Sequence, residues 1–408
     1  MRITLRGFSL GLISFLLLLI SVYTRSILLF SLFLSLLLLI ARALNQLEKL
    51  DIVRDKLVVE RVIENYRVLE GGETEIKLVV ENRSNIEIPY IYVLDIVPRE
   101  IRVIGSSSFR SILRENSVIE YRYRVRVDNP GRHDLSLIRV RYGDSLALFL
   151  EELFFERYSY ITALPRTASV KIFDKIRSLY PGVLLRGRSL GGMYDLWGFR
   201  EYTPGDDIRK IYWKGFARTG RVYVREDIGE SRPRTLLVIG LTRASWFVGS
   251  RYNSYAETLL RLTRSIGEYI LNSYGSLDVV VCNNVITKIL RGVTSSNRER
   301  FLSVFDEIPY RGGCTSIGIL LMNLYRASDT IYDLVVITST PADLITSDPV
   351  DLMKYLRESD LRGVIVIPNL DYEKDIGRGI TKRISEVISS VGFTLIMTEE
   401  SFYRVMRE

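Results

Sequence analysis

The chain has 408 residues, of which 47% are hydrophobic and 25% charged, so we expect two or three folded domains rather than one core. Its formal net charge of +8 suits an anionic membrane surface and does not by itself indicate nucleic acid binding. Two cysteines and one histidine exclude a disulfide-rich framework, a Cys-rich zinc site and a multi-His metal site, and no cofactor is expected.

The N-terminus contains two uncharged apolar runs, from Gly7 to Val22 and from Ser26 to Ala41, separated by Tyr23, Thr24 and Arg25. A helix needs about 20 apolar residues to cross a bilayer, and each run approaches that length with its flanking residues. We therefore expect a transmembrane helical hairpin over residues 1–45. A cleaved signal peptide is the alternative, but it would leave the second run unexplained.

Basic residues flank this hairpin at its outer ends. Arg2 and Arg6 precede the first helix, Arg42 and Lys49 follow the second, and the turn carries only Arg25. The positive-inside tendency then places both ends of the hairpin, and the chain that follows, in the cytoplasm. Gln46 is the sole glutamine, which together with abundant Arg, Glu and Tyr leans toward a thermophilic source.

Residues 46–165 are predicted to form an immunoglobulin-like β-sandwich. Segments such as EIKLVVEN and IEYRYRVRV alternate apolar and polar residues, and Gly-Gly, Asn-rich and Asn-Pro-Gly turns separate them. His133 follows the last of these turns. It is interpreted as a loop or strand-end histidine rather than a catalytic base.

Residues 166–233 form a linker and a Gly-rich, charged block whose chemistry has three interpretations. Glu201, Asp206 and Asp207 are candidate catalytic or cation-binding carboxylates. The basic residues are candidate phosphate ligands: Arg209, Lys210, Lys214, Arg218 and Arg225. The favoured interpretation is a buried or half-buried Arg–Asp network, in which Asp206 or Asp207 caps a helix that runs to Ala217.

The string GGMYDLWGFREYTPGDDIRKIYWKGFART resembles the signature of the domain-of-unknown-function family fifty-eight. The matching positions are Arg200, Tyr202, Pro204, Gly205, Asp206, Asp207, Arg209, Ile211, Trp213, Lys214, Ala217 and Arg218. Tyr212 departs from the family, where an Asp is usual. The resemblance implies two apolar helices, a β-sandwich, the signature and a von Willebrand factor A-like domain. It also implies a MoxR-type AAA+ ATPase as partner, but no reaction.

Residues 234–408 alternate apolar strands with helices, which predicts an α/β, Rossmann-like or von Willebrand factor A-like domain with a parallel sheet. The expected strands are TLLVIGL, LDVVVCN, YDLVVITST, GVIVIPN and FTLIMT. The expected helices lie near 255–274, 296–307, 317–327, 349–359 and 382–390.

The resemblance makes a divalent-cation site in this domain testable. Gly240 stands where the family of von Willebrand factor A domains has its first Asp, Ala244 where it has a Ser, and Thr340 where it has a later Asp. Thr242 and Thr315 keep hydroxyl groups. Because hydroxyls without a carboxylate do not offset the dehydration of magnesium, the site is interpreted as lost.

Cys314 carries an alternative, since Gly312-Gly313-Cys314-Thr315 precedes an expected helix whose N-terminus can hold an anion or activate a thiolate. No histidine lies nearby in the sequence, so a catalytic role is disfavoured. Cys282 is expected in the core.

Together these features predict a non-enzymatic, membrane-anchored scaffold or partner-binding protein that works with a MoxR-type AAA+ ATPase in assembly or maturation of other proteins. The partners are then the lipid bilayer and a protein, not nucleic acid. An envelope hydrolase using Asp206 and Asp207 is the alternative. An outward-facing, metal-dependent adhesion module is a third hypothesis, which Gly240 and the charges of the hairpin disfavour.

Overall fold

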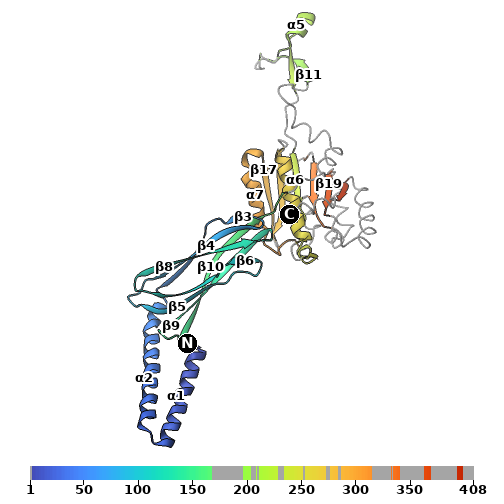
Figure 1. Ribbon diagram of the computed structural model, residues 1–408. Helices are drawn as coiled ribbons and strands as arrows, with labels where there is room; N and C mark the ends of the chain where they lie inside the picture. Colours follow the sequence, from blue (N-terminus) through green and yellow to red (C-terminus); the bar gives the residue numbers. More distant parts are fainter. Residues whose placement is uncertain are drawn as a thin grey trace, which may run out of the picture. The chain divides into compact units, whose positions relative to one another are not determined.

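The computed structural model describes residues 2–167, 196–203, 208, 211–227, 234–250, 253–272, 276–283, 286–314, 332, 334–340, 363–368 and 393–397. They fall into two compact units, Met1–Leu164 and Pro165–Glu408, which are described separately. The first unit contains the apolar helices and a β-rich body, and the second contains the signature segment and an α/β sheet (Figure 1).

Two apolar helices open the first unit, as predicted: α1 (Leu5–Thr24) and α2 (Ile27–Lys49). Arg25 reverses the chain between them in a left-handed conformation, φ 51°, and its N–H bonds the carbonyl of Ser21. By length and composition both helices are suited to cross a membrane. The second helix runs beyond the predicted end of the hairpin and continues into a short 3₁₀ turn, η1 (Leu50–Val53).

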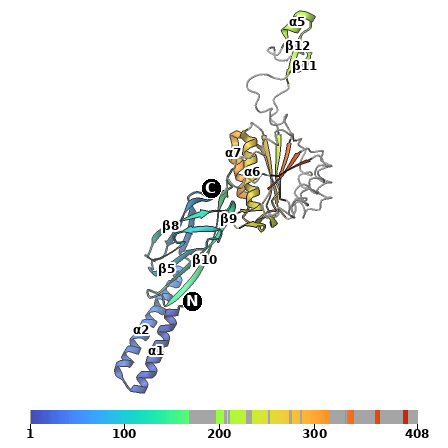
Figure 2. The same cartoon turned by 45° about the vertical axis from the view of Figure 1, so that its right-hand side comes forward.

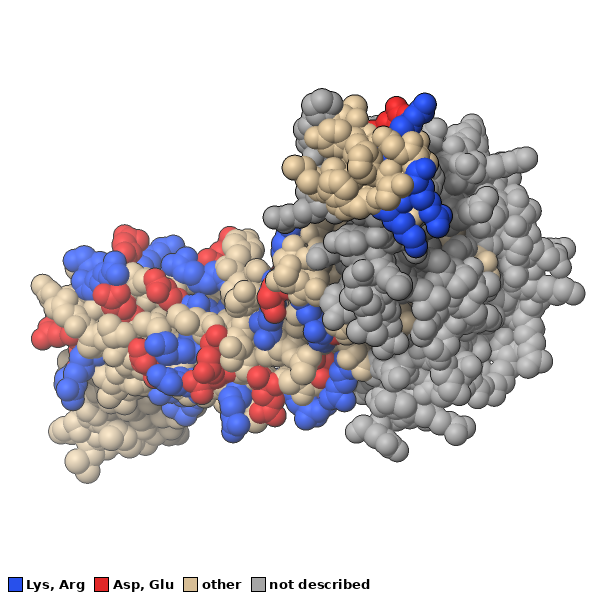
Figure 3. Space-filling view, turned by 90° about the horizontal axis from the view of Figure 1, so that it is seen from above, with Lys and Arg blue, Asp and Glu red and all other residues tan. Residues whose placement is uncertain are grey.

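The β-rich body has two sheets, which confirms the predicted β-structure of this region. One sheet has the order β1-β10-β9-β5-β7, with β3 also paired to β10, and the other has the order β2-β4-β8-β6. The strands are β1 (Arg2–Ile3), β2 (Leu57–Ile63), β3 (Arg67–Leu69), β4 (Gly72–Asn82), β5 (Ile88–Asp95), β6 (Ile101–Ile104), β7 (Ser108–Leu113), β8 (Ser117–Val127), β9 (Gly131–Gly143) and β10 (Phe149–Leu164). Alternation along β4 buries Ile76, Leu78 and Val80 in the shared core, while charged side chains of both signs cover the outer faces (Figure 3).

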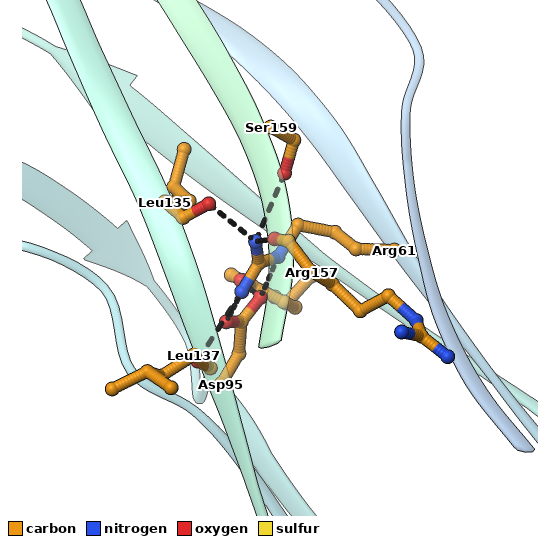
Figure 4. Close-up of polar contacts among 7 residues, drawn as sticks. Arg61, Asp95, Leu135, Leu137, Arg157 and Ser159 are labelled. Carbon is orange, nitrogen blue, oxygen red and sulfur yellow. Dashed lines mark hydrogen bonds and ion pairs between the residues drawn. The ribbon is translucent and has the colours of Figure 1, made fainter. Parts of the chain in front are cut away.

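A buried ion pair ties the two sheets together (Figure 4). Arg61 of β2 bonds Asp95 of β5 through both Nε and Nη2, and both side chains have 0% exposure. The remaining guanidinium hydrogens reach the Ser159 hydroxyl and the carbonyls of Leu135, Leu137 and Arg157, all on β9 and β10. The contacts on β10 lie at its bulge between Glu156 and Ser159. Every polar hydrogen of the guanidinium therefore has an acceptor, as burial of such a group requires.

His133 lies inside strand β9 rather than in a loop, and its side chain is 3% exposed. Its Nε2 lies 2.9 Å from the carbonyl oxygen of Asn129. Burial lowers the pKa of His133, so the ring is neutral near pH 7. The histidine belongs to the packed body.

The N-terminal helices are joined to the β-rich body by direct contacts far apart in the sequence. Strand β1 pairs with the start of β10, and the Thr4 N–H donates to the carbonyl of Leu148 at 3.0 Å. Gly7 permits this approach, because a Cβ there would lie 2.5 Å from that same carbonyl oxygen. The hairpin and the body consequently meet without a linker on the α1 side.

The second unit contains a six-stranded sheet with the order β17-β16-β13-β18-β19-β20. Its strands are β13 (Arg234–Ile239), β16 (Ser276–Asn283), β17 (Ile286–Val293), β18 (Leu334–Thr338), β19 (Gly363–Ile367) and β20 (Phe393–Met397). All five predicted strands are confirmed, and they pair in parallel. Strand β17 was not predicted, and it runs antiparallel along β16.

A buried carboxylate holds together the end of the β16–β17 pair that lies away from the turn joining the two strands. Asp278, 0% exposed, accepts the Gly292 N–H at 2.7 Å and the Tyr332 hydroxyl at 3.0 Å. Burial and this carboxylate raise the pKa of Tyr332 to about 12. The contact lies beside the register shift between Leu277 and Val279, so it supports the end of the antiparallel edge strand.

Helix α6 (Tyr255–Asn272) confirms the first predicted helix of this unit, and a shorter α7 (Arg298–Leu302) lies on the same side of the sheet (Figure 2). The second predicted helix is only partly correct, because 3₁₀ segments η5 (Ser295–Asn297) and η6 (Ser303–Glu307) flank α7. The helices predicted near 317–327, 349–359 and 382–390 lie outside the described residues.

Candidate functional site

The signature segment forms two antiparallel strands with a short helix in the connection between them. Strand β11 (Leu196–Glu201) pairs antiparallel with β12 (Tyr223–Asp227), and Ile211 pairs with Val224 through an isolated bridge. Helix α5 (Trp213–Thr219) begins directly after Tyr212, whose N–H bonds the carbonyl of Tyr223. Gly220, φ 71°, follows the last residue of the helix and caps its end.

Aromatic side chains organise this segment. The rings of Phe199 and Tyr212 lie 4.4 Å apart, and those of Trp213 and Phe216 meet edge to face at 6.4 Å. Gly215 leaves room for the Tyr212 ring, since a Cβ there would lie 2.4 Å from it. The family departure at Tyr212 is thus accommodated by a neighbouring glycine.

The aromatic cluster of this segment is open to solvent. Trp213 is 57% exposed, Phe199 43%, Phe216 41% and Tyr212 37%. Among the described side chains of β11, α5, β12 and the bridging residue Ile211, only that of Val224 in β12 is buried. Trp213 therefore does not fill a core position. A high aromatic content alone does not distinguish a buried segment from an exposed aromatic cluster, because both produce the same sequence pattern.

Several basic side chains also lie in this segment. Arg200, Lys214, Arg218 and Arg221 are all exposed. Arg221 pairs loosely with Glu201 at 3.4 Å, and Arg200 donates to the Thr203 hydroxyl at 3.1 Å. The described surface is thus aromatic and cationic, and we name the set Phe199, Arg200, Tyr212, Trp213, Lys214, Phe216, Arg218 and Arg221 the aromatic–basic surface.

Several predicted signature residues lie outside the described residues: Pro204, Gly205, Asp206, Asp207, Arg209 and Lys210. Their predicted Arg–Asp pairs and helix cap stay predictions. Tyr202 is described, and its N–H bonds the carbonyl of Val222 next to β12. Helix α5 starts later than expected, and Tyr212 at its N-cap makes no side-chain capping bond.

The degenerate metal positions gather at the carboxyl ends of β13 and β18. The Gly240 N–H bonds the carbonyl of Thr338 at 2.8 Å, and Thr340 follows that strand with 0% exposure. Thr242 is buried, with its hydroxyl 3.2 Å from that of Ser245. Ala244 is exposed in the 3₁₀ turn η4 (Ala244–Trp246), and Thr315 is outside the described residues.

These positions hold hydroxyl and backbone groups rather than carboxylates. Across the described ranges, no group of three His, Cys, Asp or Glu side chains is placed to hold a metal ion. Magnesium prefers several oxygen ligands with carboxylates among them. The described residues of this edge therefore do not fit a divalent-cation site.

Cys314 lies at the same edge but has no free thiol, because it is disulfide-bonded. The sequence has one other cysteine, Cys282. Cys314 pairs with Thr242 through a parallel bridge, and Gly313, φ 144°, lets the chain approach Leu241. Oxidation of Cys314 removes the thiolate that the catalytic alternative requires.

The sequence interpretation overlooked three members of the aromatic–basic surface, Phe199, Phe216 and Arg221. Their signal was present: aromatic and basic residues interleave through LWGFRE and WKGFARTGR without the periodic apolar face of a core helix. Such a helix in a globular domain usually buries one stripe, whereas α5 has no buried residue.

A comparison with protein families finds one that matches the signature segment. Residues 198–292 match the sequence model of the family "Protein of unknown function DUF58". The matched range spans the described parts of β11, α5 and β12 and extends through α6 to β17. No curated protein matches the chain.

Solved structures give distant likenesses. A FixG-related protein from Vibrio parahaemolyticus is 12% identical, with a TM-score of 0.19, over 27% of this chain and 97% of its own. The cupredoxin domain of amoB from Nitrosocaldus yellowstonii is 6% identical, with a TM-score of 0.20, over 26% and 86%. A CARDB domain from Pyrococcus furiosus, solved with di-metal ions, is 14% identical, with a TM-score of 0.19, over 26% and 86%. TM-scores this far below 0.5 decide nothing about this chain.

Proposed function

We propose, because residues 198–292 carry the DUF58 family match, that this chain is a membrane-anchored, non-catalytic partner-binding protein. The aromatic–basic surface is its docking element. The two apolar helices α1 and α2 hold the chain at the membrane. The observation that carries the proposal is the exposure of four aromatic side chains on one short helix and its neighbouring hairpin.

Exposed aromatic and arginine side chains are the chemistry of binding hot spots. Trp, Tyr and Arg are enriched among residues whose truncation weakens an interface by more than about 2 kcal/mol. A ring such as Trp213 gains most of its burial only when a partner covers it. An isolated surface aromatic needs no explanation, but a cluster within one segment indicates an interaction surface.

The charge of this surface selects the type of partner. Arg200, Lys214, Arg218 and Arg221 outnumber Glu201 among the described exposed side chains of the segment. A complementary partner therefore presents acidic groups around an apolar pocket. The family resemblance suggests a MoxR-type AAA+ ATPase as that partner, acting in the assembly or maturation of other proteins.

The α/β unit supports the accompanying proposal of a von Willebrand factor A-like domain. Numbered in chain order, its six strands follow the doubly wound order 3-2-1-4-5-6, with the third antiparallel. The exchange of carboxylates for Gly240 and Thr340 suits a domain that binds protein without a metal ion.

The experiment measures binding of a purified MoxR-type ATPase from the same organism to the full chain in nanodiscs. The double variant Trp213→Ala/Phe216→Ala is expected to weaken binding about tenfold or more, since it removes two exposed rings. Ile112→Ala is the matched control, because Ile112 is 58% exposed on strand β7 and should leave binding unchanged.

Equal binding by the double variant and the control would contradict the docking surface. The hydrolase alternative makes a different prediction about the same chain. Asp206→Asn or Asp207→Asn would then abolish an envelope-degrading activity while leaving ATPase binding unchanged.

A further inference from the structure

We propose that the turn between β9 and β10, residues 144–148, is a third bilayer contact that reaches the headgroup layer beside the two helices. The proposal rests on the anchoring role of α1 and α2 stated above. It adds a non-helical element to that anchor and places one end of the β-rich body against the lipid.

The depth of the turn follows from its contacts with the first turn of α1. The Leu148 carbonyl accepts the Thr4 N–H at 3.0 Å, and the Ala147 carbonyl accepts the Thr4 hydroxyl at 2.8 Å. Helix α1 has 20 residues, which at about 1.5 Å per residue gives roughly 30 Å. That length equals the thickness of the hydrocarbon core, about 30 Å, so α1 has no spare turn to lift the β-rich body away from the lipid.

Helix α2 places the turn at the same level from the other side. Gln46 Oε1 accepts the Ser145 N–H at 3.3 Å and the Ser145 hydroxyl at 3.2 Å. A small apolar cluster fills the space between the helices and the turn: Ala43, Leu47, Leu148 and Phe149, with Leu10 and Ile40 packed against it. Leu10 and Ile40 belong to the apolar runs themselves, so the cluster extends to the hydrocarbon boundary.

The chemistry of the turn suits this position. Asp144 is its only ionisable residue, and it is 0% exposed. Its Oδ2 accepts the Leu146 N–H at 2.9 Å and its Oδ1 accepts the Phe149 N–H at 2.7 Å. The carboxylate therefore faces inward and satisfies backbone donors, which non-helical chain near lipid requires.

The turn presents an apolar side chain outward. Leu146 is 48% exposed at its tip, next to the exposed hydroxyl-bearing Ser145. At the level of the first turn of α1, an outward leucine contacts the bilayer interface rather than bulk water. Transfer of such a side chain into the interface adds hydrophobic stabilisation to the anchor.

The test places an environment-sensitive fluorophore on Leu146→Cys in the full chain reconstituted in vesicles. Leu69→Cys is the control, because Leu69 is 57% exposed and pairs with Leu164 at the opposite end of β10. The unsubstituted chain is the labelling blank for Cys282 and Cys314. We expect blue-shifted emission and quenching by headgroup-labelled lipids at position 146, with an iodide quenching constant severalfold lower than at position 69.

Equal iodide quenching at both positions, in a chain that floats with the vesicles, would overturn the turn contact and leave the helical anchor standing. Failure of the unsubstituted chain to float would overturn the anchor and the turn contact together. Labelling at Ser145→Cys repeats the measurement on the same turn, in case the leucine substitution disturbs folding.

Discussion

At the scale of single residues, the Arg61–Asp95 pair makes the sharpest stability prediction. Among the described residues, Arg61→Ala would leave the buried Asp95 carboxylate with the Tyr123 hydroxyl, 2.5 Å away, and would remove one donor from each of three carbonyls of β9 and β10. Removing one partner of a buried pair costs about 3–5 kcal/mol. We expect the melting temperature of the first unit, followed by circular dichroism, to fall clearly.

A matched substitution at an exposed pair isolates the effect of burial. Lys77 and Glu120 form a similar ion pair at 3.2 Å, but their side chains are 31% and 48% exposed. Lys77→Ala should change stability by about 0–1 kcal/mol, because exposed pairs are screened and flexible. If both variants melt alike, the interpretation of Arg61 as a tie between the sheets is wrong.

His133 predicts a pH dependence of stability. Burial lowers its folded-state pKa below the ordinary value of about 6.5, so the unfolded chain binds a proton more readily than the folded chain. Its contribution is therefore present above about pH 6.5 and is lost as the pH falls toward the folded pKa, with a slope of at most about 1.4 kcal/mol per pH unit.

Urea unfolding of the wild-type chain and of His133→Gln between pH 7.5 and 5 measures this effect. His133 is the only histidine, which makes the comparison specific. The wild-type curve should fall more steeply than the variant curve below pH 6.5. Parallel curves would show that His133 does not couple folding to protons.

At the scale of elements, the strands could be predicted from the sequence, but the solvent exposure of the signature segment could not. The five parallel strands of the second unit are short runs rich in Val, Ile and Leu, whose length and β-branched content favour buried strands over helices. Strand β17 was not predicted because ITKILRGV lacks strict alternation and has Gly292, φ 67°, next to its last residue. For α5, the sequence shows which side chains are aromatic, but it does not show whether other parts of the chain cover them.

Trp213 tests the revised view of the signature at this scale. Since its side chain is 57% exposed, Trp213→Ala should lower stability by less than about 1 kcal/mol. A buried tryptophan would cost about 3–5 kcal/mol on truncation. Thermal melting of the second unit distinguishes the two values.

Leu260→Ala provides the comparison for a core position in the same unit. Leu260 lies on α6 with 0% exposure, so its truncation should cost about 2–5 kcal/mol. Should Trp213→Ala lower the melting temperature as much as Leu260→Ala does, the structural interpretation of the signature would return and the docking surface would fail.

At the scale of the whole molecule, the apolar hairpin and the β-rich body were each predictable from periodicity, but their direct junction was not. Gly7 and Leu148 meet across a separation that no local pattern records. Thr4 reads in the sequence as an ordinary helix cap, and it does accept the Gly7 N–H, yet it also bonds two carbonyls of a distant turn. Long-range pairings of this kind depend on tertiary packing.

The orientation of the chain is a prediction at this scale. The basic ends of the hairpin predict both units in the cytoplasm, so protease added to intact cells should leave them uncut. Permeabilised cells provide the positive control. Digestion from outside would overturn this orientation.

The pairing of β1 with β10 has a consequence for the order of events during synthesis. The hydroxyl of Thr4 donates to the carbonyl of Ala147, which is synthesised 143 residues later. At a synthesis rate of about 5–20 residues per second, the interval between the two residues is roughly 7–30 s. Both apolar helices leave the ribosome long before then, so the hairpin enters the bilayer while the sheet lacks its last strand. The β-rich body is completed on a chain that is already tethered, and its final strand β10 pairs with β1, which precedes the hairpin.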